Sequence, residues 1–216
     1  MTRTVDDTIV ERSTRLDFAI ADVDVFCVGL DEARREPDSR DVLAALLARS
    51  LECDPASIRF RRDAWGKPHL LNQPNVHVNV SRSRSHLVVA IGSRSLGVDI
   101  EVVRPVVDRM ALGTLHLTPF EWAKVLAANE DRRDELFLVA WTRKEACAKA
   151  IGAGLRIPPA LIASGVDRGL ARTSVPFGNA VHVMDVESRF VSGTAVVSLA
   201  VLLTPMPAPD FEDDSG

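Results

Sequence analysis

The sequence has few cysteines and no long apolar run, and both absences exclude classes of protein. Cys27, Cys53 and Cys147 are odd in number and are not spaced like metal ligands. They predict small, buried thiols in a reducing cytoplasm rather than a disulfide framework. The most apolar late stretch, residues 195–203, is far shorter than the roughly 20 residues of a membrane-spanning helix. No apolar segment follows basic residues at the N-terminus, so we expect no secretory signal.

An excess of basic residues is also absent. The 26 Lys and Arg residues against 30 Asp and Glu residues give a formal net charge of −4, which argues against a protein that coats nucleic acid. We therefore expect neither a nucleic acid nor a membrane as partner. The composition that remains is ordinarily globular, and 216 residues suffice for a core in one large or two small domains.

Strand-like and helical stretches alternate along the chain. Residues 39–50 predict a helix that Ser39 can cap, with Val42, Leu43, Leu46 and Leu47 on one face. The polar segment SRSRS separates two strand-like stretches as a hairpin loop would. All strand-like stretches are rich in β-branched residues, and they span residues 16–30, 58–60, 76–80, 86–92, 96–103, 180–186 and 193–203.

Two further helices are predicted in the second half. Thr118, Pro119 and Glu121 combine an N-cap, a proline at the first helical position and a capping-box acid. A longer helix spans about residues 131–151 and stops at Gly152. Each half thus offers a strand, helices and a hairpin, which favours two similar α+β halves over one continuous sheet.

The stretch LGVDIEVV at residues 96–103 places two acids in an apolar strand. Because residues two apart share a face of a strand, Asp99 and Glu101 project together while Val98, Ile100 and Val102 face a core. Neighbouring carboxylates repel each other unless a cation lies between them, and Mg²⁺ prefers such oxygen ligands. The alternative is the exposed face of an edge strand.

The stretch WTRKEACAKAIGAGL at residues 141–155 places a third acid on a helix. Trp141, Glu145 and Lys149 are four residues apart and share one helical face. The small neighbours Ala146 and Ala150 permit close packing of this helix against a sheet, which would bring Glu145 near buried structure. The alternative is a surface Glu–Lys pair with Trp141 in the core.

Two turns carry groups suited to phosphate. In RRDAWGKPHL, Gly66 allows close approach of a ligand to the backbone, and Lys67 supplies a point charge. In NVSRSRSHL, Ser81, Arg82 and Ser83 offer hydroxyl and guanidinium groups. The alternatives are an ordinary turn with a lysine and a solvated hairpin tip.

Taken together in their order along the chain, the four stretches resemble the 4′-phosphopantetheinyl transferase superfamily, the larger type that activates fatty-acid, polyketide and peptide synthetases. The resemblance rests on GKP at 66–68, NVS at 79–81, GVDIE at 97–101, and W-x-x-K-E-A-x-x-K at 141–149 followed by G-x-G-L. It implies transfer of the phosphopantetheine arm of coenzyme A (CoA) to a serine of an apo acyl, polyketide or peptidyl carrier protein, with Mg²⁺ and release of 3′,5′-ADP.

The resemblance also implies a fold and a division of the chain. We expect an α+β protein of two similar halves related by a pseudo-twofold axis, each a small antiparallel sheet packed with helices, with the active site between them. The expected halves are residues 1–103 and 104–206, and the acidic residues 207–216 are expected to be a disordered tail. Because two such halves complete one site, a monomer suffices.

Site residues follow from the matched motifs. The resemblance assigns Asp99, Glu101 and Glu145 as metal ligands, and Glu145 and Lys149 as catalytic residues, with Glu145 either the base for the carrier serine or a ligand only. Lys144 would contact the pyrophosphate or lie on the helix surface. The full set implied for CoA is Arg35, Trp65, Gly66, Lys67, Pro68, Ser81, Arg82, Ser83, Lys144 and Lys149.

The sequence departs from the family's pattern in two places. Arg82 stands where the family usually has histidine; it can bind phosphate but cannot take part in proton transfer. His86 lies across the predicted hairpin loop and is not expected to replace it. The basic stretch before the first helix is short, and Arg35 is the best candidate there for the 3′-phosphate, with a solvated loop as the alternative.

Other functions stay open at this point. A non-catalytic relative that binds CoA or a carrier protein is the main alternative, and a Mg²⁺-dependent phosphotransferase with another acceptor is a third. Glu121 is explained by its capping box, although it also fits an acid of the family. The predicted carrier surface comprises Arg104, Arg109, Met110 and residues 112–120.

Overall fold

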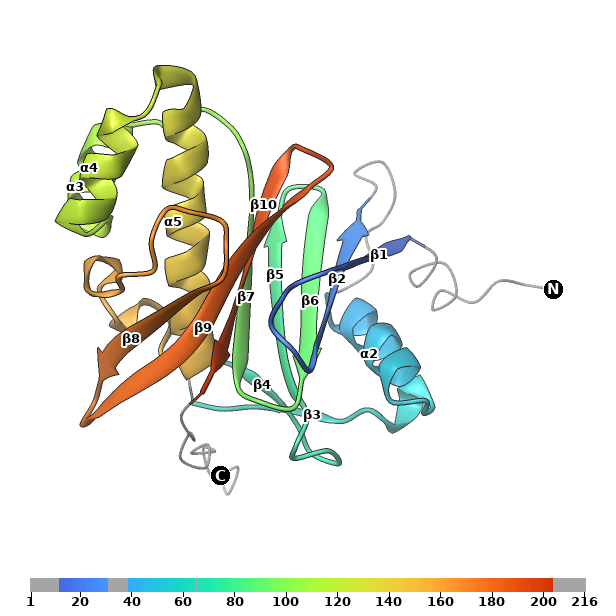
Figure 1. Ribbon diagram of the computed structural model, residues 1–216. Helices are drawn as coiled ribbons and strands as arrows, with labels where there is room; N and C mark the ends of the chain where they lie inside the picture. The colour runs from blue at the N-terminus through green and yellow to red at the C-terminus, as the bar shows by residue number, and fades with distance from the viewer. Residues whose placement is uncertain (1–11, 31–38, 65, 204–216) are drawn as a thin grey trace.

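The computed structural model describes residues 12–30, 39–64 and 66–203 (Figure 1). These residues form two antiparallel sheets with helices on their outer faces, which confirms the predicted α+β fold. No helix in the described part of the chain has the length and apolar composition needed to cross a membrane.

The first sheet has the strand order β1-β2-β6-β5-β4-β3. Its strands are β1 (Ser13–Leu16), β2 (Val23–Gly29), β3 (Phe60–Arg62), β4 (Pro68–Leu70), β5 (His77–Ser83) and β6 (His86–Gly92). Helix α2 (Ser39–Ser50) covers one face of this sheet. Val42, Leu46 and Leu47 of α2 are fully buried there, as the predicted apolar face of the helix requires.

The second sheet has the strand order β7-β10-β9-β8. Its strands are β7 (Leu96–Val102), β8 (Ala171–Phe177), β9 (Ala180–Val191) and β10 (Ala195–Leu202). Helix α5 (Glu130–Ile151) lies on the outer face, with α3 (Arg109–His116) and α4 (Pro119–Ala127) beside its N-terminal half (Figure 1). Short 3₁₀ turns complete the described elements at Pro55–Ser57, Gly154–Arg156 and Pro159–Leu161.

Helix α5 approaches β7 at a glycine. A Cβ atom at Gly97 would lie only 2.2 Å from the backbone oxygen of Ala146 and 2.4 Å from the backbone nitrogen of Ala150. The predicted close packing of small helical residues on a sheet is therefore confirmed. Because of this contact, the C-terminal turns of α5 lie directly over the strand that carries Asp99 and Glu101.

The inner faces of the two sheets share one apolar cluster. Val88 and Ala90 of β6 meet Val98 and Ile100 of β7 and Val197 of β10, all at most 1% exposed. The predicted burial of Val98 and Ile100 is confirmed. Strand β7 precedes residue 103 but pairs with β10, so the first half of the chain supplies one strand of the second sheet. The division of the chain at residue 103 stays a prediction.

Some local predictions were wrong. The segment predicted as a hairpin loop, residues 81–85, continues strand β5 to Ser83, and only Arg84 and Ser85 form the turn. Arg84 takes the left-handed conformation that a two-residue turn needs, with φ of 50°. Helix α3 and strand β8 were not predicted, although α3 is amphipathic and β8 alternates buried and exposed residues.

Candidate active site

A cavity of about 700 Å³ opens beside the C-terminal end of α5. Five cationic side chains line it, and no Asp or Glu is among its lining residues. The cations come from four elements and the turn before β4, and the full lining is Arg40, Leu43, Phe60, Arg62, Gly66, Lys67, Pro68, Asn79, Val80, Ser81, Arg82, Leu87, Lys149, Gly152 and Gly154. Such a cavity suits a ligand with several phosphate groups.

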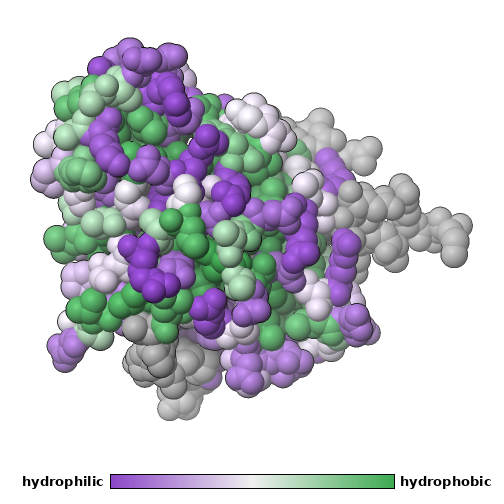
Figure 2. Space-filling model, viewed as in Figure 1, coloured by the Kyte–Doolittle hydropathy of each residue, from purple (hydrophilic) through white to green (hydrophobic). Residues whose placement is uncertain are grey.

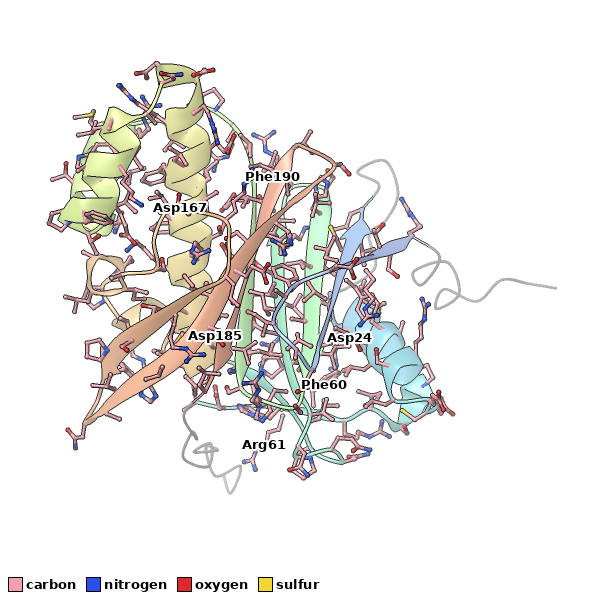
Figure 3. All side chains as sticks on the ribbon, in the orientation of Figure 1. Asp24, Phe60, Arg61, Asp167, Asp185 and Phe190 are labelled. Carbon is pink, nitrogen blue, oxygen red and sulfur yellow. The ribbon has the colours of Figure 1, made fainter. Side chains whose placement is uncertain are left out.

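One end of the cavity is formed by β3 and the turn before β4. Phe60 lines the cavity and Arg61 is its neighbour on the same strand, both at the lower end of the first sheet in Figure 3. Arg62 donates from Nη1 to the backbone oxygen of Gly66 at 2.6 Å. Gly66 has φ of 83°, a conformation that favours glycine and lets the turn close tightly.

Lys67 connects this turn to helix α5. Its Nζ donates to the backbone oxygens of Lys149 at 3.0 Å and Ala150 at 2.9 Å, and to Ser95 Oγ at 3.0 Å. Burial lowers the pKa of Lys67 to about 8, against the opposing influence of Asp63. The ammonium group therefore caps the negative end of the α5 dipole while its side chain lines the cavity.

Asp99, a predicted acid of β7, contacts two residues that line the same cavity. Asp99 is 6% exposed and accepts from Lys149 Nζ at 2.6 Å and from Ser81 Oγ at 2.7 Å. Lys149 Nζ also donates to Ser81 Oγ at 3.0 Å. Because Ser81 and Lys149 line the cavity, they place its cationic lining in direct contact with the carboxylate of Asp99.

Asp99 and Glu101 are near enough to Glu145 for their charges to act on it. The pKa of Glu145 is raised, first by burial and then by the negative charge of Asp99, with Glu101 adding to it and Lys149 opposing it. The structure thus brings the three predicted acids and Lys149 into one region. Sequence spacing alone could not show this, because Glu145 follows Asp99 by 46 positions (145 minus 99).

The three acids do not form a ready-made metal cage. Within residues 12–30, 39–64 and 66–203, no group of three or more His, Cys, Asp or Glu side chains has the arrangement of a metal site. The oxygen atoms of the three acids are of the kind that Mg²⁺ prefers, and this ion usually takes one or two protein carboxylates and completes its shell with phosphate and water. Burial first, and then the negative charges of Asp99 and Glu101, raise the pKa of Glu145, and a cation between these carboxylates would reduce their repulsion.

Ser83 contacts an acid and is not among the residues that line the cavity. Its Oγ donates to Glu101 Oε2 at 2.9 Å and accepts from the backbone nitrogen of Val102 at 3.3 Å. Ser83 therefore contacts the acidic strand, and its predicted contact with CoA stays a prediction. His86 lies directly across from Ser83 in the strand register, closer than predicted, because the turn has only two residues.

Lys144 was predicted to contact the pyrophosphate or to lie on the helix surface; the second prediction was wrong, and the ion pair of Lys144 with Glu121 argues against the first, which stays a prediction. Lys144 is 1% exposed and forms an ion pair with Glu121 at 2.6 Å, and it also donates to the backbone oxygen of Pro159 at 3.0 Å. Glu121 accepts from the backbone nitrogens of Thr118 at 2.9 Å and Gly165 at 2.8 Å. The predicted capping box is confirmed, and this buried pair joins α4 to α5 away from the cavity.

The remaining predicted residues divide into four groups. Gly66, Pro68 and Arg82 line the cavity with Lys67, Ser81 and Lys149. Trp141 packs against Phe137, with ring centroids 6.5 Å apart, which confirms its predicted packing role. Arg35 and Trp65 lie outside the described residues. On the predicted carrier surface, Met110 is 61% exposed, whereas Arg109 is paired with Glu130 and Asp134.

Some residues of the cavity were not predicted. Arg62, Asn79 and Gly152 line it, and Arg40, which was only mentioned beside Arg35, does so as well. Arg40 follows the helix start at Ser39, and Arg62 lies four residues before Gly66. Their proximity to recognised motifs was the only available signal, because their elements meet only in the folded chain.

A second groove of about 430 Å³ lies between α5 and β9, near Asp167 and Phe190 (Figure 3). Figure 2 shows polar residues over this upper part of the molecule and apolar residues over the middle of the same face. Three arginines line the groove, but Arg132 is paired with Glu135 and Arg189 with Glu187. The groove is therefore less suited to phosphate than the cavity at the end of α5.

Comparison with known proteins confirms the resemblance inferred from the motifs. Residues 95–179 match the model of the 4′-phosphopantetheinyl transferase superfamily. The chain is 30% identical over 119 residues to the 4′-phosphopantetheinyl transferase Sfp of Bacillus subtilis (strain 168), covering 55% of this chain and 52% of that protein. It is 32% identical over 124 residues to the 4′-phosphopantetheinyl transferase gsp of Aneurinibacillus migulanus, covering 55% and 51%.

A cyanobacterial relative gives the same result. The match to the 4′-phosphopantetheinyl transferase HetI of Nostoc sp. is 28% identical over 129 residues, 58% of this chain and 54% of that protein. The chain thus spans about half the length of the curated relatives it matches. The matched superfamily model covers β7, α5 and the residues between them, which carry the three acids and Lys149.

Proposed function

We propose that this protein is a 4′-phosphopantetheinyl transferase, which moves the phosphopantetheine arm of CoA to a serine of an apo acyl, polyketide or peptidyl carrier protein. One observation carries the proposal: a cavity lined by five cations and no acid meets, through Lys149 and Ser81, the carboxylate of Asp99. The similarity of about half of this chain to proteins named 4′-phosphopantetheinyl transferase supports the proposal.

The cavity accounts for CoA as a ligand. A pyrophosphate and a 3′-phosphate carry several negative charges, which Arg40, Arg62, Arg82 and Lys149 can contact from different sides of the cavity. Phe60 and other apolar lining residues such as Leu43 offer surface to the uncharged parts of the ligand. In this proposal, Lys67 holds the end of α5 and contributes positive charge to the cavity.

The reaction replaces one phosphorus–oxygen bond with another. The carrier serine oxygen bonds to the phosphorus that carries the pantetheine arm, and the bond from that phosphorus to the bridging oxygen breaks. The serine proton passes to a base, and 3′,5′-ADP leaves. Lys149 and Arg82 stabilise the charge on the phosphate oxygens. Glu145 is our candidate for the base, and its role as a ligand only is the alternative.

Mg²⁺ belongs to the proposal as the cofactor. Asp99, Glu101 and Glu145 would hold it, and when bound it would neutralise charge on the pyrophosphate. The ammonium of Lys149, which is bonded to Asp99, would then turn toward the phosphate oxygens. A chain with both halves present can complete this site, so a monomer suffices. Cys27 and Cys147 are buried as predicted, whereas Cys53 is exposed; all three thiols are free, which agrees with a cytoplasmic enzyme.

Mass spectrometry of an apo carrier protein tests the proposal. The carrier is incubated with CoA, Mg²⁺ and this protein, and the mass gain of the phosphopantetheine arm is measured. We expect the gain with the wild type and none with Asp99→Ala. A protein that binds CoA without a mass gain on any acyl or peptidyl carrier would instead be the non-catalytic relative.

A further inference from the structure

The active site lies where the two sheets meet, and their strands are not paired there. Strands β5 and β7 run side by side (Figure 1), yet they belong to different sheets. No strand pairing joins β5 to β7 in the described part of the chain. Because Ser81 comes from β5 and Asp99 from β7, something other than a backbone ladder must set their relative position.

Side chains of β5 make this connection. Asn79 Oδ1 accepts from the backbone nitrogen of Val98 at 2.9 Å, in a buried bond. Ser83 Oγ accepts from the backbone nitrogen of Val102 and donates to Glu101 Oε2. Between these two contacts, Ser81 Oγ donates to Asp99 Oδ1. Three alternate residues of one strand therefore contact successive positions of the other.

The alternation of β5 explains why these side chains share a face. Val78 and Val80 point to the apolar cluster under α2. Asn79, Ser81 and Ser83 therefore point to the opposite face, toward β7. A buried backbone N–H without an acceptor is costly. Asn79 is 7% exposed and gives the N–H of Val98 its acceptor at the edge of the second sheet.

We propose that Asn79 and Ser83 are positioning residues of the active site: they fix β7 against β5 and so place Asp99 and Glu101 beside the cationic cavity. Asn79 acts on the backbone just before Asp99, and Ser83 acts on Glu101 and the backbone that follows it. The consequence for catalysis rests on the proposed function. The contacts themselves can be tested without any turnover.

Hydrogen exchange tests the Asn79 contact in the free protein. Asn79→Leu keeps the size of the side chain and removes the acceptor of the Val98 amide. We expect exchange of that amide to rise at least about tenfold, measured by NMR. Asn72→Leu is the matched control, because Asn72 bonds to Ser57 far from β7. Unchanged protection of the Val98 amide in Asn79→Leu would overturn the positioning role.

Cation binding tests the Ser83 contact. Ser83→Ala should weaken the binding of Mn²⁺, used as a probe for Mg²⁺ and followed by electron paramagnetic resonance, by about 10-fold to 100-fold. The KM for CoA should stay within about twofold, because Ser83 is not among the residues that line the cavity. Ser83→Thr should restore Mn²⁺ binding, since it keeps the hydroxyl. Ser85→Ala, in the adjacent turn, is the control.

The outcomes separate this inference from the proposed function. A raised KM for CoA with unchanged Mn²⁺ binding in Ser83→Ala would make Ser83 a CoA contact and overturn the inference. Unchanged Mn²⁺ binding together with an unchanged KM for CoA in Ser83→Ala would overturn the inference as well. Failure of the wild type to transfer the arm would refute the proposed function, while faster exchange of the Val98 amide in Asn79→Leu would still support the connection between the strands.

Discussion

The buried ion pair between Lys144 and Glu121 gives the sharpest prediction. The two side chains are 0% and 2% exposed, and Nζ and Oε2 are 2.6 Å apart. Lys144→Met removes the cation and leaves the carboxylate of Glu121 buried, which costs about 3–5 kcal/mol. Since a domain of this kind has a total stability of about 5–15 kcal/mol, we expect a large shift of the urea midpoint at an unchanged m-value.

A double variant isolates the cause. Glu121→Gln combined with Lys144→Met removes both charges, and the side-chain amide oxygen introduced at position 121 can still accept from the backbone of Gly165 or Thr118. We expect the double variant to be more stable than Lys144→Met by about 2 kcal/mol or more. The KM for CoA of folded Lys144→Met should equal that of the wild type. Full stability with a raised KM would mean that Lys144 contacts the substrate, and it would refute our assignment.

Four further predictions follow from single contacts. Gly97→Ala should destabilise the fold by more than about 2 kcal/mol, because the added Cβ atom would clash with the backbone of α5. Gly169→Ala is the control and should not destabilise the fold, because there is open space around this glycine. Urea unfolding measures both effects. Lys149→Met should lower kcat by about 100-fold or more, measured by carrier mass gain, and near-normal turnover would contradict its role. Arg62→Met should raise the KM for CoA about tenfold, because Arg62 lines the cavity. Arg61→Met should leave this KM unchanged, because Arg61 does not line it. Equal effects of the two variants would contradict the assignment of Arg62 as a CoA contact. Burial lowers the pKa of Lys67 to about 8 from 10.5, so at this residue the unfolded chain binds more protons between these values. The free energy of unfolding of the wild type minus that of Lys67→Met should therefore rise with pH in that window, and parallel profiles of the two proteins would refute this.

Much of the fold could be predicted from local pattern. Helix α2 begins and ends at the predicted residues, and α5 ends at Gly152, whose φ of 80° favours glycine. Strand β6 has its predicted bounds as well. These elements have strong periodicity or clear end signals. Helix α3 is amphipathic and strand β8 alternates buried and exposed residues, yet both were missed; in the fold, β8 packs against β9 and α3 against α5.

Part of the site could also be predicted from local sequence pattern. Asp99, Glu145 and Lys149 lie in ordered motifs, and the structure brings them into one region. Lys144 was not predicted to pair with Glu121, because its position beside Glu145 says nothing about its partner. Only the packing of α4 on α5 places Glu121 against it.

The sequence by itself determined which residues carry charge, where α2, α5 and β6 form, and which face of β7 bears the acids, because each depends on neighbours within a few positions. Only the tertiary structure decided that Arg40, Arg62 and Arg82 line one cavity with Lys149. It also decided that Asn79 and Ser83 reach β7. These contacts join elements distant in the chain, and they form because burying the apolar faces of two sheets and two helices brings those elements together.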